Sequence, residues 1–282
     1  MNRRDAALLV LLGALWGAIY PLTAVVLRDL PVLAIVAART GLAAVVLTPL
    51  AFHRGVMKVL WTRPGGVLVA SLVQVVIPLA LLTSAQQYVS AGLAGILLAT
   101  QPVWAAVLSA GVSRTVRARQ VAGVLIGLCG VTVLFLRDVQ LGSSSGWAAI
   151  ALVAAAAFIA AGALWVERGL SDVPPLGIAA AAMAISTVMI TPVAAVAKIS
   201  PPPPSTVGLL LILGVVSTAG ALVLFYTLIH HIGAVRANLA GYLDPGFAVV
   251  YSMIFLGEIA TPAALLGLLL ILAGSYIGAT SR

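Results

Sequence analysis

The chain has 282 residues, of which 62% are hydrophobic and 8% are charged, with a formal net charge of +8. Soluble domains carry about 25% charged residues. This composition therefore excludes a soluble enzyme and a disordered chain, and it leaves too few charges for a nucleic-acid-binding face. The one cysteine, Cys129, excludes an internal disulfide and a cysteine-based metal site. A protein that crosses a membrane many times fits these numbers.

Ten apolar stretches have the length of about 20 residues with which a helix crosses the hydrocarbon core. In chain order they cover residues 6–27, 31–52, 65–84, 89–111, 119–136, 146–167, 175–197, 207–230, 236–256 and 262–280. The sequence therefore predicts an all-α membrane protein with ten transmembrane helices and no soluble domain. Its start, Met1 to Arg4 before an apolar run, is typical of a signal peptide, but the run is too long for one. We expect it to remain as the first span.

Lysine and arginine are distributed unequally between the two predicted faces of the membrane. Eleven of the 15 lie on the side of the N terminus, three lie on the opposite side, and Arg39 lies within a span. Positively charged residues accumulate on the cytoplasmic side of membrane proteins. Both termini are therefore expected in the cytoplasm.

The two halves of the sequence repeat each other. Three pairs of segments match in the same order at an offset of 143 or 144 residues: Leu47–Ala51 with Ile190–Ala194, Gln101–Trp104 with Asp244–Phe247, and Gly123 and Gly130 with Gly267 and Gly274. Each half then holds five spans. Because five is an odd number, the second half is expected to lie inverted in the membrane relative to the first.

These repeats divide the chain into residues 1–140, the first five-helix repeat, and residues 147–282, the second, inverted repeat. Residues 141–146 are rich in glycine and serine and are expected to form a flexible joint. Inverted repeats hold a substrate site near the middle of the bilayer and let the two halves rock around it. The duplication therefore predicts a transporter.

Several short motifs occur in a fixed order along the chain: Trp16-Gly17, Ala38-Arg39-Thr40, Tyr88 to Ala94 followed by Gln101-Pro102, Tyr242 to Pro245 followed by Leu256-Gly257-Glu258, and Gly267 to Gly274. By these motifs and its ten spans the chain resembles the drug/metabolite transporter superfamily, in its EamA-type branch. The resemblance covers almost the whole chain. It implies export of small metabolites, including amino acids, from the bacterial cytoplasm. Within the branch the chain is similar to aromatic amino-acid exporters.

Two charged residues fall inside predicted spans, where a charge costs at least about 2.5 kcal/mol. Asp244 and Arg39 each lie about 12 Å deep, at 1.5 Å per residue, from opposite faces of the membrane. Asp244 could couple transport to protons or bind a substrate amino group, and Arg39 could hold a substrate carboxylate. Equally, the two side chains could pair with each other or satisfy the ends of broken helices.

Two amides and three aromatic residues complete the predicted substrate site. Gln74 and Gln101 lie inside spans, where an amide must find a partner, so they could bind a zwitterion or join helices to each other. Trp16 and Tyr20 lie four residues apart on one helix face and could stack on a planar substrate or face lipid. Tyr242 is a weaker candidate of the same kind.

Three prolines interrupt predicted spans. Pro78, Pro102 and Pro245 are expected to act as hinges, because proline breaks a helix and frees a carbonyl group. Glu258 stands at the end of the ninth span, where we expect it to be exposed to solvent.

No catalytic motif appears, since the sequence lacks a zinc-protease motif, a phosphate-binding glycine loop and an acidic pair. We therefore expect a chain that is not an enzyme, binds no metal and no cofactor, and is driven by a gradient of substrate or ions. Its expected partners are a small-molecule substrate and the lipid bilayer, without nucleic acid. The pairs Gly123/Gly127 and Gly274/Gly278 would let helices pack closely, between the two halves or in a homodimer.

The leading hypothesis is a secondary transporter in the cytoplasmic (inner) membrane of a bacterium. It would export small metabolites by alternating access, with amino acids, and aromatic ones in particular, as the first guess. The alternative is a proton-coupled multidrug cation exporter, because Asp244 beside Trp16 and Tyr20 would suit a cation. Sugar-phosphate exchange is disfavoured, since phosphate binding wants several convergent cations. Outside transport, the alternative is a structural or signalling membrane protein.

Overall fold

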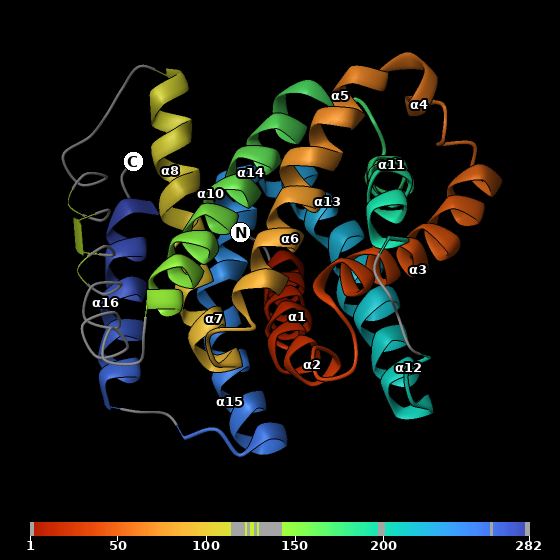
Figure 1. Ribbon diagram of the computed structural model, residues 1–282. Helices are drawn as coiled ribbons and strands as arrows, with labels where there is room; N and C mark the ends of the chain where they lie inside the picture. The colour runs from red at the N-terminus through yellow and green to blue at the C-terminus, as the bar shows by residue number, and fades with distance from the viewer. Residues whose placement is uncertain are drawn as a thin grey trace.

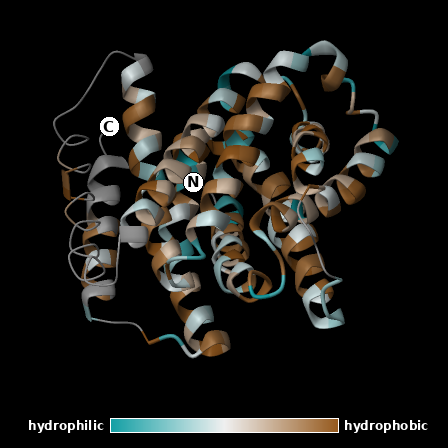
Figure 2. Ribbon diagram, viewed as in Figure 1, coloured by the Kyte–Doolittle hydropathy of each residue, from teal (hydrophilic) through white to brown (hydrophobic). Residues whose placement is uncertain are grey.

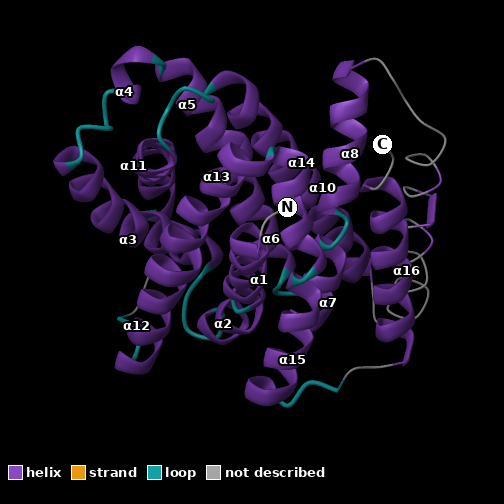
Figure 3. Ribbon diagram, turned by 180° about the vertical axis from the view of Figure 1, so that it is seen from behind, coloured by secondary structure: helices purple, strands orange, loops and turns teal. Residues whose placement is uncertain are grey.

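The computed structural model describes residues 3–113, 143–196, 201–259 and 262–279, together with a few isolated positions between 113 and 143 (Figure 1). Within these ranges the chain is helical, and short loops and turns join its helices (Figure 3). The predicted fifth span, 119–136, and the Gly-x-x-x-Gly pairs lie outside the residues whose side chains are described. Helix α10 begins at Ser143, so the described part of the predicted joint is helical.

Eight helical stretches in the described part of the chain are long and apolar enough to cross a membrane. They are Arg3–Val26, Val32–His53, Pro64–Ala85, Ala91–Gly111, Gly146–Gly169, Pro175–Ala194, Pro204–Ile232 and Ala234–Leu256. Each coincides with one of the ten predicted spans, and α16 (Pro262–Ala279) covers the predicted last one. The prediction of a helical protein that crosses the membrane many times is confirmed.

The outer surface of the helices suits lipid. Figure 2 shows hydrophobic residues along all the long helices. Large apolar side chains are strongly exposed on several of them, among them Val45, Ile150, Val188, Ile254 and Phe255. In water such a surface would be unfavourable, whereas lipid tails are as apolar as these side chains.

Two of the spans contain a π-helical segment at equivalent places. The third span consists of α5 (Pro64–Ala70), the π segment η1 (Ser71–Val76) and α6 (Ile77–Ala85). The eighth consists of α12 (Pro204–Leu211), the π segment η3 (Ile212–Gly220) and α13 (Ala221–Ile232). π-Helical turns are rare and occur frequently at functional sites. Their matched positions direct attention to the space between these two spans.

Two further spans are interrupted near their middle. The fourth span breaks between α7 (Ala91–Leu98) and α8 (Gln101–Ser113). The ninth starts as α14 (Ala234–Ala237) and a 3₁₀ segment, η4 (Asn238–Tyr242), before α15 (Asp244–Leu256) begins. Pro102 and Pro245 are the second residues of α8 and α15, a position where the missing N–H of proline costs little. The prolines therefore mark where the new helical segments start.

Contacts between helices of the first repeat and helices of the second occur in equivalent pairs. The first span is α1 (Arg3–Gly17) with α2 (Ile19–Val26), and the second, α3 (Val32–His53), packs along its equivalent, α11 (Pro175–Ala194). The contact of α6 with α10 (Ser143–Gly169) corresponds to that of α13 with α1, and the contact of α8 with α10 to that of α15 with α1. A short helix, α4 (Val59–Thr62), follows α3. The two-repeat architecture fits this pairing.

Two glycines allow close helix contacts near the centre. A Cβ atom at Gly162 of α10 would lie 2.4 Å from Gln74 Oε1 and 3.0 Å from Gln74 Cα in η1. A Cβ atom at Gly17 of α1 would lie 2.5 Å from Phe247 Cβ in α15. Because real Cβ atoms do not come so close to other atoms, only glycine lets these helices approach as they do.

Glu258 has a structural partner, contrary to the expectation that it is simply exposed to solvent. Its two carboxylate oxygens accept hydrogen bonds from the backbone N–H groups of Ala91 and Gly92, each at 3.0 Å. These are N–H groups of the first turn of α7, which have no partner inside the helix. A negative charge at this end is also favoured by the helix dipole. Glu258, in the loop after α15, thus caps the N-terminal end of α7.

Candidate functional site

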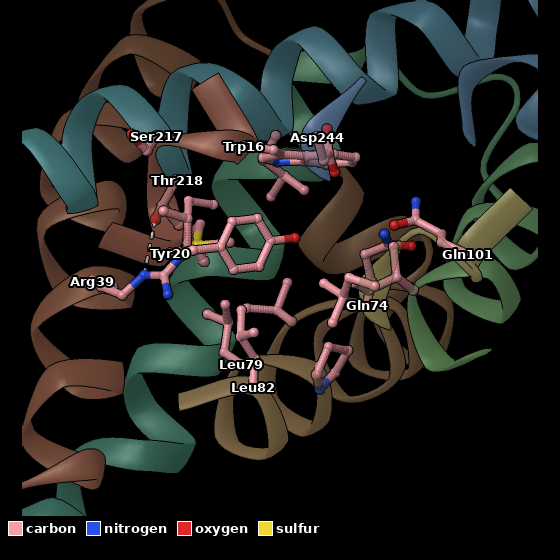
Figure 4. A pocket seen from close by; sticks show the side chains of 17 residues that line it. Trp16, Tyr20, Arg39, Gln74, Leu79, Leu82, Gln101, Ser217, Thr218 and Asp244 are labelled. Atoms are coloured by element: carbon pink, nitrogen blue, oxygen red, sulfur yellow. Dashed lines mark hydrogen bonds between the residues drawn. The ribbon is translucent and has the colours of Figure 1, made fainter. Parts of the chain in front are cut away.

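A cavity lies in the interior where the interrupted spans meet α3, α10 and α11 (Figure 4). Seventeen residues line it, and the volume open to the centres of water-sized molecules is about 80 Å³. One water needs roughly 10–15 Å³ on this measure, so the cavity suits a small molecule. Much of its wall is apolar, including Trp16, Ile159, Leu79, Leu82 and Leu222.

The polar part of the wall consists of buried side chains from both halves of the chain. Its members are Tyr20, Arg39, Gln74, Gln101, Ser217, Thr218 and Asp244. All seven side chains are at least nine-tenths buried. Ionisable groups buried within membrane spans mark substrate or ion pathways, whereas buried amides and hydroxyls also join helices.

Many lining residues are related by the repeat offset of 143. The pairs are Trp16 with Ile159, Gln74 with Ser217, Val75 with Thr218, Leu79 with Leu222, and Gln101 with Asp244. Both members of each pair line the cavity. The cavity therefore lies where the two repeats meet, with each half contributing the same helix positions but different chemistry.

Arg39, on α3, is held by a side chain of the second half. Its Nε–H donates to Thr218 Oγ1 at 3.2 Å, and Thr218 Oγ1 in turn donates to the carbonyl oxygen of Leu213 at 2.6 Å. Nη1 of Arg39 is buried and has no hydrogen-bond partner among the described residues. The described residues also contain no carboxylate within 4.0 Å of this guanidinium. Part of the charged group is left available to a ligand.

Asp244 is the first residue of α15, and its side chain is only 2% exposed. Its Oδ1 atom is buried and has no hydrogen-bond partner within the described ranges, and the N-cap residue before it is the apolar Leu243. The positive end of the α15 dipole favours a carboxylate here. Of the alternatives left open by the sequence, pairing with Arg39 is not seen among the described residues, where no ion pair joins the two side chains.

The two amides behave differently. Gln101 Nε2 donates to Asn238 Oδ1 at 2.5 Å, and Asn238 Nδ2 donates to the carbonyl oxygen of Ala234 at 2.7 Å, so Gln101 joins α8 to the interrupted ninth span. Gln74, in η1, has a buried Oε1 atom without a partner in the described part of the chain. Gln101 therefore connects helices, whereas Gln74 lines the cavity with its Oε1 atom packed against Gly162 of α10.

Two of the three predicted aromatic residues line the cavity. Trp16 also packs against Phe225, with ring centroids 4.8 Å apart. Tyr20 is 2% exposed, and its backbone carbonyl accepts a hydrogen bond from Gln86 Nε2 at 2.9 Å. Tyr242 lies in η4 and is not among the residues that line the cavity. The structure thus brings Trp16 and Tyr20 together with the polar groups and leaves Tyr242 apart.

The predicted hinge prolines lie at changes of helix type. Pro78 lines the cavity and follows η1 at the second position of α6. Pro102 and Pro245 are buried next to the lining residues Gln101 and Asp244, at the starts of α8 and α15. Each proline is therefore adjacent to a backbone irregularity at the cavity.

Ser217 and Thr218 are lining residues that the sequence reasoning missed. The signal was present, because the offset of 143 projects Gln74 and its neighbour Val75 onto these two positions. A group of three histidine, cysteine, aspartate or glutamate side chains that could hold a metal is not found in the described ranges. The arrangement offers Arg39 to an acceptor and Asp244 to a donor of a small molecule.

Comparison with known proteins agrees with this fold. The model of the EamA-like transporter family matches the chain twice, at residues 5–136 and 146–279, which together span nearly all of it. None of the curated proteins matches the chain. A solved structure described as "Crystal structure of protein" is 19% identical to it, with a TM-score of 0.72 over 99% of this chain and 98% of the other. That likeness is one of fold alone.

Proposed function

We propose that this chain, which belongs to the EamA-like transporter family, is a secondary transporter that exports small metabolites from the cytoplasm, namely amino acids and aromatic ones in particular. Family membership makes it a membrane transporter and speaks against a structural, signalling or enzymatic role. The cargo, the direction and the mechanism are the proposal.

One observation carries the choice of cargo. Arg39 Nη1 and Asp244 Oδ1 are buried in the wall of one cavity, and neither has a partner among the described residues (Figure 4). Leaving a buried charge unsatisfied costs several kcal/mol, at roughly 2–7 kcal/mol for even a neutral polar group. An amino acid in its zwitterionic form offers a carboxylate to the guanidinium and an ammonium group to the carboxylate. It satisfies both charges without adding net charge.

The aromatic part of the wall supports a planar side chain on the cargo. Trp16 and Tyr20 line the cavity beside the polar groups. Aromatic rings in contact gain about 0.5–1.5 kcal/mol beyond the burial of their area. An aromatic amino acid would use both parts of the wall at once.

The mechanism that we propose is alternating access between two inverted halves. The doubled family match and the symmetric pairing of helices support two halves around one site. The excess of lysine and arginine on the side of the N terminus supports termini in the cytoplasm, in the inner membrane of a bacterium. Export by such a chain is driven by the gradient of the cargo or of an ion.

A proton-coupled exporter of organic cations is the second candidate, and one observation favours it. Asp244, Trp16 and Tyr20 together line the cavity, and a carboxylate among aromatic rings is a cation site. Arg39 in the same wall opposes a cargo that carries only positive charge. The balance of charges therefore favours the amino acid.

Uptake into proteoliposomes tests the proposal. Labelled phenylalanine, labelled threonine and a quaternary ammonium dye are offered separately, with and without an imposed pH gradient, and protein-free liposomes serve as the control. We expect saturable phenylalanine flux that exceeds threonine flux, and no dye flux. Dye flux that requires the pH gradient would replace this function with cation export.

A further inference from the structure

Thr218 is a buried residue of the cavity wall that joins the two halves of the chain through a hydrogen bond with Arg39. It lies in the π segment η3 and is 6% exposed. Its hydroxyl contacts Arg39, which is 179 residues away in the chain. The equivalent position in the π segment η1 is Val75, which has no hydroxyl group.

The hydroxyl of Thr218 makes two hydrogen bonds that depend on each other. It donates its only hydrogen to the carbonyl oxygen of Leu213, five residues earlier, at 2.6 Å. A hydroxyl has one donor and two acceptor positions, so towards Arg39 it can only accept, and it accepts the Nε–H at 3.2 Å. The bond to Leu213 therefore orients the lone pair that Arg39 uses.

This contact fixes the direction of the guanidinium. The guanidinium is planar and its five N–H groups are fixed relative to one another. With Nε bound to Thr218, the Nη end is directed elsewhere, and Nη1 is the atom without a partner among the described residues. Arg39 belongs to the lining of the cavity, so Thr218 determines how it meets a ligand there.

We propose that Thr218 is a positioning residue, which stabilises the π-helical form of η3 and at the same time orients Arg39. The carboxylate of the cargo is therefore bound only while η3 is π-helical. The inference rests on the proposed function for its cargo. A return of η3 to α-helical geometry would turn Thr218 by about 100° relative to the residues before it. Its hydroxyl would then leave Arg39, and the site would lose its oriented cation.

Three variants of the full chain separate this role from general helix stability. Thr218→Val removes the hydroxyl and keeps the shape, and Thr218→Ser restores the hydroxyl. Thr227→Val is the matched control, because Thr227 Oγ1 donates to Val223 O at 2.7 Å in an ordinary helical turn of α13. Amide hydrogen exchange in lipid nanodiscs, without any cargo, reads out the stability of residues 212–222.

We expect the backbone amides of residues 212–222 to exchange at least about tenfold faster in Thr218→Val than in the wild type. The variant loses a buried hydrogen bond, and tenfold corresponds to about 1.4 kcal/mol, a typical contribution of such a bond. Thr218→Ser should match the wild type, and Thr227→Val should leave these residues unchanged. Equal exchange in Thr218→Val and wild type, or equal acceleration by all three variants, would overturn the proposal.

Equilibrium binding then tests the orientation of Arg39, with L-phenylalanine and phenethylamine as probes, the second of which lacks the carboxylate. Thr218→Val should bind phenylalanine about tenfold more weakly, which corresponds to about 1.4 kcal/mol, and should bind phenethylamine as the wild type does. Thr218→Ser should restore phenylalanine binding. If Thr218→Val weakens both probes equally, the positioning role is wrong. If the wild type binds neither probe, the proposed cargo fails, and the exchange experiment still decides the role of Thr218.

Discussion

Arg39 on α3 and Asp244 on α15 line one cavity, and a different part of the structure stabilises each of the two charges. Thr218 holds the guanidinium through Nε, and the start of α15 supplies the dipole that favours the carboxylate. A direct ion pair would have satisfied both charges without a ligand. Because none forms between these described residues, a dipolar cargo can occupy the place that the pair would have filled.

Asp244→Asn is expected to lower phenylalanine uptake by at least about tenfold. The substitution keeps the shape of the side chain but removes a charge-assisted hydrogen bond, which is worth about 1.5–3 kcal/mol. Thermal stability in detergent should not fall, because an amide is less costly to bury than a carboxylate. Initial uptake rates and unfolding temperatures are measured on the same preparations.

The matched control for this change is Asp172→Asn. Asp172 is exposed and pairs with Arg63 at 3.0 Å on the surface, where such pairs contribute little. It should leave uptake unaltered. Wild-type uptake by the Asp244→Asn protein would show that the carboxylate does not bind the cargo.

At the same scale, six of the seven predicted substrate residues line the cavity: Trp16, Tyr20, Arg39, Gln74, Gln101 and Asp244. They could be predicted because a polar or ionisable group inside an apolar span needs a reason to be there. Tyr242 does not line the cavity and lies at the end of the 3₁₀ segment η4, which the sequence did not indicate. Whether Arg39 and Asp244 pair could not be decided from the sequence, since helix depth does not determine a distance across the bundle.

Among the elements, the interruptions beside prolines were foreseeable and the π segments were not. Pro102 and Pro245 mark the start of α8 and α15, because proline has no N–H to continue a preceding helix. A π segment has no comparable residue signature. In η3 the Thr218 hydroxyl contacts the Leu213 carbonyl oxygen and also Arg39, and the second contact exists only in the folded structure.

Gly162→Ala is expected to destabilise the protein by about 1–3 kcal/mol, the usual effect of forcing an extra carbon into a packed interior. The new Cβ atom would lie 3.0 Å from Gln74 Cα, so η1 would have to move away from α10. The unfolding temperature in detergent measures the loss. Gly208→Ala in α12 is the control, since nothing lies within 4 Å of its Cβ position and alanine favours a helix. If Gly208→Ala lowers the unfolding temperature as much as Gly162→Ala does, close helix contact at Gly162 is not the cause of the destabilisation.

Glu258→Ala is expected to destabilise the start of α7, with a loss of about 1 kcal/mol, a typical value for a helix cap. The N–H groups of Ala91 and Gly92 would lose their carboxylate partner. Glu258→Gln should have a smaller effect, because its amide oxygen can still accept one of the two bonds. Unchanged unfolding temperatures for both variants would mean that the contact contributes nothing to stability.

For the molecule as a whole, the inverted arrangement of the halves makes a prediction about sidedness. Gln87 and His230 are exposed, and they are related by the offset of 143. If the halves are inverted, cysteines at these positions lie on opposite faces of the membrane. In a Cys129→Ser background, a membrane-impermeant thiol reagent should label Gln87→Cys in intact cells, and His230→Cys only after the cells are permeabilised.

Labelling of both cysteines from the same side would contradict the inversion, whatever the cargo proves to be. Total labelling after denaturation is the control for equal expression. The number and approximate bounds of the described spans could be predicted because apolar length is a strong signal. The way in which α3 packs along α11 could not, since both helices are apolar around most of their surface and the sequence gives no preferred face.

The pairing of Gln101 with Asp244 across the two repeats has a consequence for how such a site arises from a duplication. A chain made of the first half twice would place two amides at these positions and no carboxylate. A chain made of the second half twice would place two carboxylates there and would lack the guanidinium, because Ala182 is the equivalent of Arg39. Neither would discriminate in favour of a neutral dipolar molecule. The proposed binding of a dipolar cargo therefore depends on the difference between the two halves, and a chain with two copies of the second half is expected to favour cations.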